Sequence, residues 1–157
     1  MLSPEIFRSA LARFPTGVTI VTARDRAGGD HGMTVSAFCA LSLAPPMVLL
    51  CVDRGARLHP LLPELTHLAV NVLAHDQEPL SRRFADLDVD RFDGVPFTRG
   101  GTGCAILEGT VAAYECAVRD RFPGGDHTIV TAEVLAVAVR EGVPLIHHRG
   151  GYSRPER

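Results

Sequence analysis

The sequence contains no lysine and no tryptophan, and all 16 of its basic residues are arginines. Without a lysine, the chain cannot form a Schiff base with a carbonyl cofactor or supply the lysine of a P-loop. These absences exclude pyridoxal-type covalent catalysis and the usual P-loop nucleoside triphosphatases. The 18 acidic residues give a net charge of −2, so the chain lacks the basic surface needed to bind the phosphates of nucleic acid. We therefore expect no nucleic-acid partner.

Metal-binding and redox motifs are also missing. The four cysteines are widely spaced and form no CxxC pair, which argues against a zinc finger and a thioredoxin-type motif. Three of them stand in apolar runs, which favours small buried side chains in a reducing compartment. The seven histidines show no HExxH or comparable ligand spacing. We expect no metal site.

The N-terminus lacks the basic and then apolar segments of a secretory leader, and no uncharged apolar stretch reaches the ~18 residues of a membrane span. This pattern favours a cytoplasmic protein with no membrane partner. A chain of 157 residues, of which 46% are hydrophobic, is long enough to bury a core of its own. We predict one globular domain over residues 1–157.

Apolar residues at three- and four-residue spacing predict two amphipathic helices. The first begins with the Ser3-Pro4 start signal and ends before Pro15, and the second spans residues 77–87. A shorter helix is expected over residues 58–65. The rest is rich in β-branched and apolar runs, which predict strands over residues 17–24, 33–43, 47–52, 68–73, 106–117, 128–139 and 145–148, with a loop over 90–103.

The predicted strands outnumber the helices and do not alternate with them, which favours a mainly β fold. We predict a closed or nearly closed, Greek-key-like antiparallel barrel with peripheral helices. No GxGxxG motif follows the first strand, so a Rossmann-type dinucleotide site is not expected.

Three groups of residues are candidates for chemistry. Thr34 and Ser36 are two apart and would share one strand face, where their hydroxyls either contact a ligand or pair across strands. His127 follows a Gly-Asp turn at the start of a strand, where it either offers its imidazole to a bound ring or lies at the surface. The arginines at positions 82, 83 and 91 either bind phosphate or form a solvated face.

The chain contains, in this order, the segments FRSALARFPTGVTIVTA, GMTVSAF, LSLAPPMVLLCV, AVNVLAHDQEPLSRRFA, DRFDGV and GDHTIVTAEV. Together they resemble the short-chain flavin reductase family, and the resemblance extends from about Phe7 to Tyr152. It implies an FMN-binding split β-barrel that is usually a homodimer. It also implies that NADH or NADPH reduces FMN or FAD, and that the reduced flavin passes to a flavin-dependent monooxygenase.

The resemblance implies roles for individual residues. His127 would lie beside the nicotinamide and position it rather than act as an acid or base, with Asp126 and Tyr152 nearby. The flavin ring, its ribityl chain and its phosphate would be contacted by Pro15, Thr16, Gly17, Val18, Thr34, Val35, Ser36, Ala37, Val52, Asp53, Asn71, Val72, Ser81, Phe84, Ala85, Arg91 and Phe92.

One segment departs from the family pattern. Relatives often carry a turn rich in serine and threonine after the strand that ends at Val52, whereas this chain continues with Asp53 and, four residues later, Arg57. If Arg57 replaces hydroxyl donors there, flavin binding would depend more on charge and would weaken with salt.

The implied chemistry suits a chain without lysine or a serine nucleophile motif, because the cofactors carry the hydride transfer and the protein orients the two rings. Two other activities remain open on the same barrel: a non-catalytic flavin carrier, and an oxidase of the pyridoxamine-phosphate type. The GDHTI segment favours the reductase, because a carrier does not require an element on the nicotinamide side.

Overall fold

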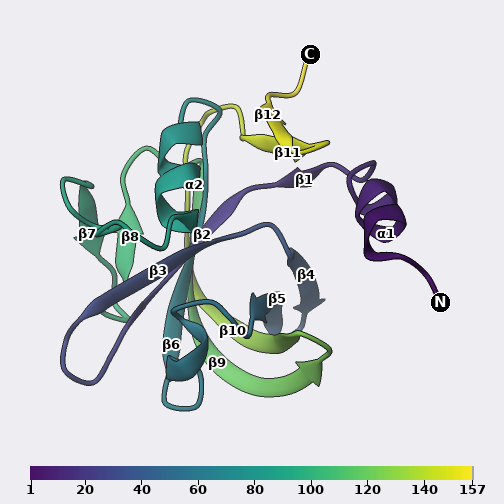
Figure 1. Cartoon of the computed structure of the whole chain (residues 1–157). Helices are drawn as coiled ribbons and strands as arrows, with labels where there is room; N and C mark the ends of the chain where they lie inside the picture. The colour runs from purple at the N-terminus through teal and green to yellow at the C-terminus, as the bar shows by residue number, and fades with distance from the viewer. Residues whose placement is uncertain (157) are drawn as a thin grey trace.

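A seven-stranded antiparallel sheet forms the body of the chain, in a computed structural model that describes residues 1–156 (Figure 1). Its strand order is β3-β2-β6-β9-β10-β5-β4. The strands are β2 (Thr19–Arg24), β3 (Asp30–Val35), β4 (Phe38–Leu43), β5 (Pro46–Asp53), β6 (His67–Val72), β9 (Ala112–Gly124) and β10 (His127–Val139). The predicted mainly β fold is therefore confirmed.

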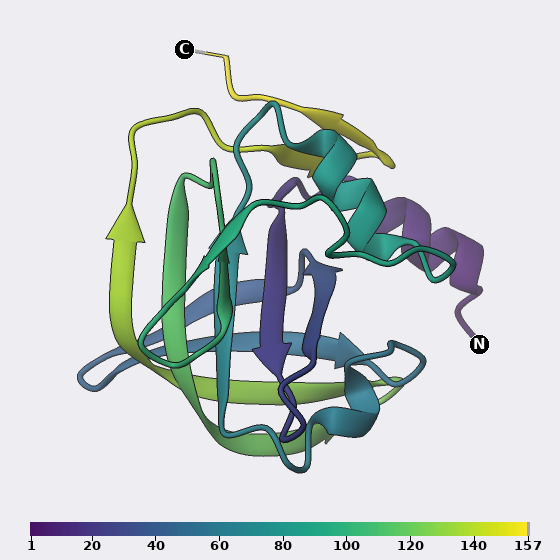
Figure 2. The ribbon, with the colours of Figure 1, turned by 90° about the vertical axis from the view of Figure 1, so that its left-hand side faces the viewer.

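The barrel is split rather than closed. Strands β3 and β4 follow each other in the chain but form the two outer edges of the sheet. The sheet curls because β9 and β10 run along it and then bend across its lower end (Figure 2). The β9–β10 register shifts at two places, between Thr131 and Ala132 and between Val134 and Ala136. Such bulges bend strands.

Two apolar cores lie on the two faces of β2 and β6. Along β2, Val21 and Ala23 belong to the core inside the barrel, whereas Ile20 packs on the other side with Leu73 and Phe84. This division follows from the alternation of side chains along a strand. The apolar residues of β6 are buried on both faces of the strand. Burial alternates along β5 although its sequence is apolar throughout, because one of its faces lines a cavity instead of a core.

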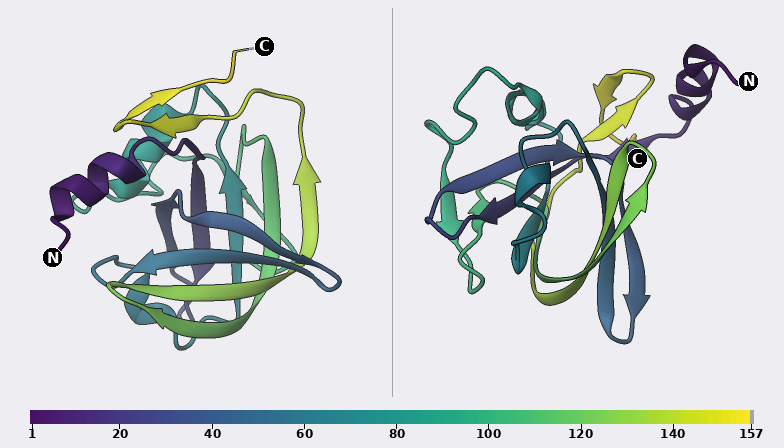
Figure 3. Two further views of the ribbon diagram at one scale, coloured as in Figure 1. Left: turned by 90° about the vertical axis from the view of Figure 1, so that its right-hand side faces the viewer. Right: turned by 60° about the horizontal axis from the view of Figure 1, so that its bottom comes forward.

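The helices differ in how they are held. Helix α2 (Glu78–Ala85) buries Phe84 completely in the second core. Helix α1 (Pro4–Leu11) begins at the predicted Ser3 cap but buries no residue, and it stands away from the sheet (Figure 3). A single 3₁₀ turn, η1 (His59–Leu61), lies within the helix predicted over residues 58–65. Within residues 1–156, no helix has the length and apolar character needed to span a bilayer.

Small strands complete the fold. β1 (Thr16–Gly17), β11 (Ile146–His148) and β12 (Gly151–Ser153) form a three-stranded sheet next to α1, and β7 (Phe97–Arg99) pairs with β8 (Ala105–Leu107). Strand β7 falls within the loop predicted over residues 90–103, and β12 lies beyond the last predicted strand.

Two predicted strands are divided in the structure. The strand expected over residues 33–43 is interrupted at Ser36 and Ala37, where the amide of Phe38 donates to the carbonyl of Ser36 at 2.9 Å. The strand expected over residues 106–117 is interrupted at Gly109, whose φ of 76° lies in the left-handed region that glycine tolerates.

Candidate functional site

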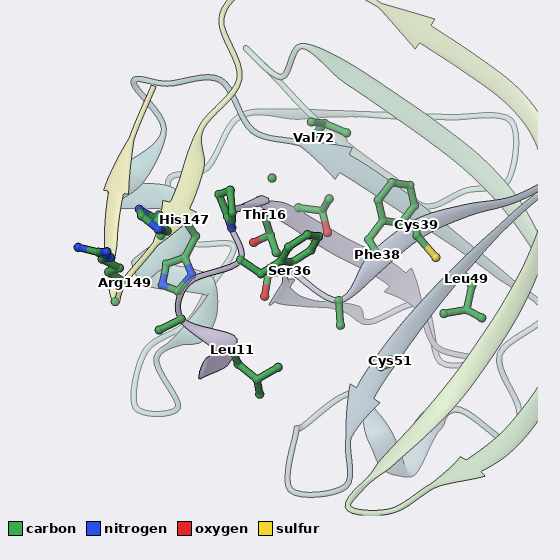
Figure 4. A pocket seen from close by; sticks show the side chains of 18 of the residues that line it. Leu11, Thr16, Ser36, Phe38, Cys39, Leu49, Cys51, Val72, His147 and Arg149 are labelled. Atoms are coloured by element: carbon green, nitrogen blue, oxygen red, sulfur yellow. The ribbon is translucent and has the colours of Figure 1, made fainter. Parts of the chain in front are cut away.

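A cavity of about 980 Å³ lies beside the split between β3 and β4 (Figure 4). Ligand pockets usually occupy about 300–1,000 Å³, so this cavity is large enough for a cofactor. Segments from seven strands, α1 and the connections between them supply its walls. The lining residues are Arg8, Leu11, Ala12, Phe14, Pro15, Thr16, Gly17, Thr19, Ser36, Ala37, Phe38, Cys39, Leu49, Cys51, Val72, Tyr114, His147, His148, Arg149 and Gly150.

The cavity has an apolar wall and a basic rim. Phe38 and Tyr114 pack with their ring centroids 5.8 Å apart, and Leu49 lies on the same wall. Two of the basic rim residues, His147 and Arg149, come from β11 and the turn that follows it. This arrangement can hold a flat apolar ring at the wall and an anionic group at the rim.

Thr16 carries an unpaired hydroxyl in the wall of the cavity. Its Oγ1 is buried and has no hydrogen-bond partner among residues 1–156. A buried polar atom without a partner is rare in native proteins, and a bound ligand is one explanation for it. Ser36 adds an exposed hydroxyl to the lining. The size, apolar wall and free hydroxyls of the cavity fit a flavin.

Six of the residues expected to contact flavin line this cavity. They come from three separate segments of the chain: Pro15, Thr16, Gly17, Ser36, Ala37 and Val72. The structure therefore brings together the PTGV segment, the end of the TVSA segment and the end of β6.

Several expected flavin contacts have side chains that are sealed in the two cores instead. Val18, Val35, Val52 and Phe84 are at most 4% exposed. An apolar side chain buried this completely stabilises the core and cannot touch a ligand unless the core opens. In this structure these four side chains therefore lie in the cores behind the cavity and not in its wall.

Asn71 is also a structural residue in this arrangement. It is fully buried, and its side-chain amide donates to the carbonyl of Ile20 at 3.1 Å. Its carbonyl oxygen accepts from the amide of Leu107 at 2.9 Å. The side chain thus ties β6 to β2 and β8, and both of its ends are occupied. The interruption that Asn71 makes in an apolar run marks this cross-strand link.

The expected phosphate-side residues gather at a second, smaller pocket. Arg57, Arg91 and Phe92 line a space of about 260 Å³ together with Asp90 and the β3 residues Asp30, His31 and Gly32. Arg91 is buried and donates to the carbonyls of Gly32 at 2.7 Å and Asp86 at 2.9 Å. Burial lowers the pKa of its guanidinium. Arg91 therefore holds the loop after α2 against β3, whereas Arg57 is exposed.

The remaining residues around α2 form a third group. The hydroxyls of Ser81 and Tyr152 are 2.9 Å apart, and Thr34 donates its hydroxyl to the carbonyl of Ser81 at 2.6 Å. Arg82 lies 5.0 Å from the centroid of the Tyr152 ring. Thr34 and Ser36 do not share a face as expected, because the strand ends at Val35. Ala85 is exposed at the end of α2.

His127 begins β10 and pairs with Asp53 on β5. Its Nδ1 lies 2.7 Å from Asp126, which lowers the pKa of the Asp126 carboxyl, and its Nε2 lies 4.0 Å from Asp53. Tyr152 packs against α2 and His147, so the structure gives His127 and Tyr152 different neighbours. His127 is half-buried and does not line the large cavity.

Some lining residues were missed in the sequence, and the cysteine prediction holds only in part. The rim residues His147, His148 and Arg149 precede two glycines, and a glycine pair of this kind can indicate the turn of a hairpin. Cys104 and Cys116 are buried as expected, and burial raises the pKa of Cys116 to about 12. Cys39 is exposed and lines the cavity instead.

Comparison with known proteins relates the chain to flavin reductases in both sequence and structure. Residues 11–156 match the family model of the flavin reductase like domain. The chain is 43% identical over 143 residues to the actinorhodin polyketide dimerase of Streptomyces coelicolor, covering 90% of this chain and 81% of that protein. It is 41% identical over 151 residues to the FMN reductase (NADH) SmoA of Agrobacterium fabrum, covering 96% and 86%. The structure of the Streptomyces globisporus NADH:FAD oxidoreductase SgcE6 in complex with NAD and FAD fragments superimposes with a TM-score of 0.92 at 37% identity, covering 99% and 96%.

Proposed function

Because this chain belongs to the flavin reductase like family, as its sequence segments predict, we propose that it uses NADH or NADPH to reduce FMN or FAD. The observation that supports this most directly is the large cavity, whose apolar wall carries the unpaired hydroxyl of Thr16 and whose rim is basic. The chemistry supplied by the two cofactors when bound is hydride transfer from nicotinamide to flavin.

The residues of this chain bind and orient the flavin. The apolar wall around Phe38 and Leu49 excludes water from one part of the cavity. Thr16 and Ser36 offer hydroxyls, which donate to or accept from polar edges of the flavin. The short strand β1 fixes Thr16, since Thr16 pairs with His147 of β11. No proton donor or nucleophile is required of the protein for the hydride step.

We assign His127 a positioning role toward the nicotinamide. Asp126 and Asp53 flank its imidazole and fix its orientation at the start of β10. Replacing His127 by Ala should raise the KM for NADH about tenfold, while the Kd for flavin changes less than twofold. Steady-state kinetics and a flavin titration check this. The opposite split, with flavin binding weakened and the KM for NADH unchanged, contradicts the assignment.

We further propose a homodimer and a flavin-dependent monooxygenase as the acceptor of reduced flavin. Helix α1 supports the dimer, because it buries no residue within the described chain and leaves Ile6, Phe7 and Leu11 more than half exposed. An isolated helix of eight residues is marginal in water, so a second copy would stabilise it. Relatives named as the reductase subunit of a flavin-dependent monooxygenase and as the flavin reductase of styrene monooxygenase support the acceptor.

The test of the function is the absorbance of NADH and of NADPH at 340 nm, with purified protein and with FMN, FAD or no flavin added. We expect oxidation that saturates with added flavin and is absent after heat denaturation of the protein. A protein that binds flavin but leaves both nicotinamides unoxidised is a flavin carrier. A protein that retains a tightly bound FMN and leaves both nicotinamides unoxidised is an oxidase of the pyridoxamine-phosphate type. Either result overturns the proposal.

A further inference from the structure

The hairpin between β11 and β12 carries an arginine in an unusual backbone conformation. Arg149 and Gly150 form its two-residue turn, with φ angles of 51° and 74°. Two positive φ angles are typical of a type I′ turn, in which asparagine and glycine are preferred. A larger side chain is strained at a positive φ, and Arg149 is the non-glycine residue with this conformation within residues 1–156. Strain of this kind is often kept where a side chain has a function.

The guanidinium of Arg149 is also uncommitted. It is exposed, and it forms no hydrogen bond or ion pair with any of residues 1–156. Two other arginines of the chain are fully engaged: Arg91 donates to two carbonyls, and Arg99 forms a two-pronged ion pair with Asp30. Arg149 is therefore a strained residue whose charge is not used within the described chain.

The position of Arg149 indicates what it binds. It lies at the rim of the large cavity beside His147, whereas the apolar wall around Phe38 lies on the other side of the cavity (Figure 4). Arg8 also lies at this rim, and its guanidinium is 3.9 Å from Glu5, so it is weakly paired. A ligand whose ring lies on the apolar wall would keep its charged end at the rim. A guanidinium suits a phosphate because its parallel N–H groups match two phosphate oxygens.

We propose that Arg149 binds a phosphate of a nucleotide cofactor at the mouth of the cavity and so selects phosphorylated over unphosphorylated ligands. The inference rests on the proposed flavin reductase function. The phosphate has two possible sources, the flavin nucleotide and the nicotinamide nucleotide, and their shared chemistry makes Arg149 suited to either.

The Arg149→Asn variant separates binding from structure. Asparagine is preferred in this turn, and the variant retains the backbone N–H that donates to the carbonyl of Ala12 at 3.1 Å. We expect its melting temperature to rise by about 2 °C, because turn strain is relieved. We expect the KM for the ligand bound through its phosphate to rise about tenfold at low salt. Arg149→Lys keeps the positive charge but not the paired N–H groups of a guanidinium, so its KM should lie between those of the wild type and Arg149→Asn.

The control is Arg140→Asn, because Arg140 is exposed after β10 and does not line the cavity. KM values are measured for FMN, riboflavin and NADH. A rise for FMN without a rise for riboflavin identifies the flavin phosphate, and a rise for NADH with riboflavin as acceptor identifies the nicotinamide nucleotide. An active variant in which all three KM values match those of Arg140→Asn overturns the inference and leaves the flavin reductase function standing. If the wild-type protein oxidises neither NADH nor NADPH, the proposed reductase function itself is contradicted, whatever the variants show.

Discussion

The region around β8 and the wall of the large cavity differ in how completely their polar groups are paired. On the side of β8, the buried side chains of Thr22 and Asn71 are fully engaged, with Thr22 donating to the carbonyl of Ala105 at 2.6 Å. On the side of the cavity, Thr16 has a buried hydroxyl without a partner and Arg149 has a free charge. Near β8, these polar side chains find their hydrogen-bond partners within the described chain. At the cavity, the Thr16 hydroxyl and the Arg149 guanidinium remain available to a ligand.

The same two regions also differ in how completely their apolar side chains are buried. Leu73, Phe84 and Leu107 are fully buried on the side of α2 and β8. Phe14 of the cavity wall is 75% exposed, and Phe7 of α1 is 52% exposed. Exposed apolar groups of this size usually mark an interaction site. The α2 side therefore stabilises the fold, while the cavity and α1 leave apolar surface exposed where we propose that a cofactor and a second subunit bind.

The largest expected effect is on the side of β8. Replacing Asn71 by Leu leaves the buried amide of Leu107 and the carbonyl of Ile20 without their side-chain partner. Each unsatisfied buried group costs about 1–3 kcal/mol, so we expect the free energy of unfolding to fall by about 3 kcal/mol. Urea denaturation measures it. Unchanged stability together with weakened flavin binding would restore Asn71 as a ligand contact and remove the contrast between the two regions.

Asn71 also shows how far the sequence was informative. The fold class and most long strands were predicted from their β-rich apolar runs. The number of buried faces followed from the sequence only for β6, because the equally apolar β5 turns Leu49 and Cys51 toward the cavity and the second half of β10 is exposed. The same sequence could not distinguish an Asn that contacts a ligand from one that links three strands. That difference depends on Leu107, which is distant in the chain. The resemblance placed the PTGV segment and Ser36 at the site, but it did not find Arg149, whose turn between two short strands lacks a periodic signal.

A second prediction tests whether α1 is covered by another subunit. Phe7→Asp places a charge on the exposed face of α1, where it would not disturb the core of one subunit. Burying an unpaired charge in an interface is costly, so we expect dimer association to weaken by about 2 kcal/mol or more. Sedimentation equilibrium measures it. Leu87→Asp is the matched control, because Leu87 is 53% exposed and lies beyond the end of α2. Equal dissociation constants for both variants, or a monomeric wild type, would contradict the interface.

The smallest expected effect is that of removing one threonine hydroxyl, which should change the free energy of unfolding in opposite directions in the two regions. Thr16→Val removes a buried hydroxyl that has no partner, so we expect the free energy of unfolding to rise by about 1 kcal/mol and flavin binding to weaken by a similar amount. Thr22→Val removes a hydroxyl bonded to the Ala105 carbonyl, so it should lower the free energy of unfolding by about 1 kcal/mol and leave the Kd for flavin unchanged. Denaturation curves and flavin titrations of both variants measure the four changes. Loss of stability in both variants, with no change in flavin binding, would contradict the comparison. It would mean that the Thr16 hydroxyl stabilises the fold through a hydrogen bond, as the Thr22 hydroxyl does.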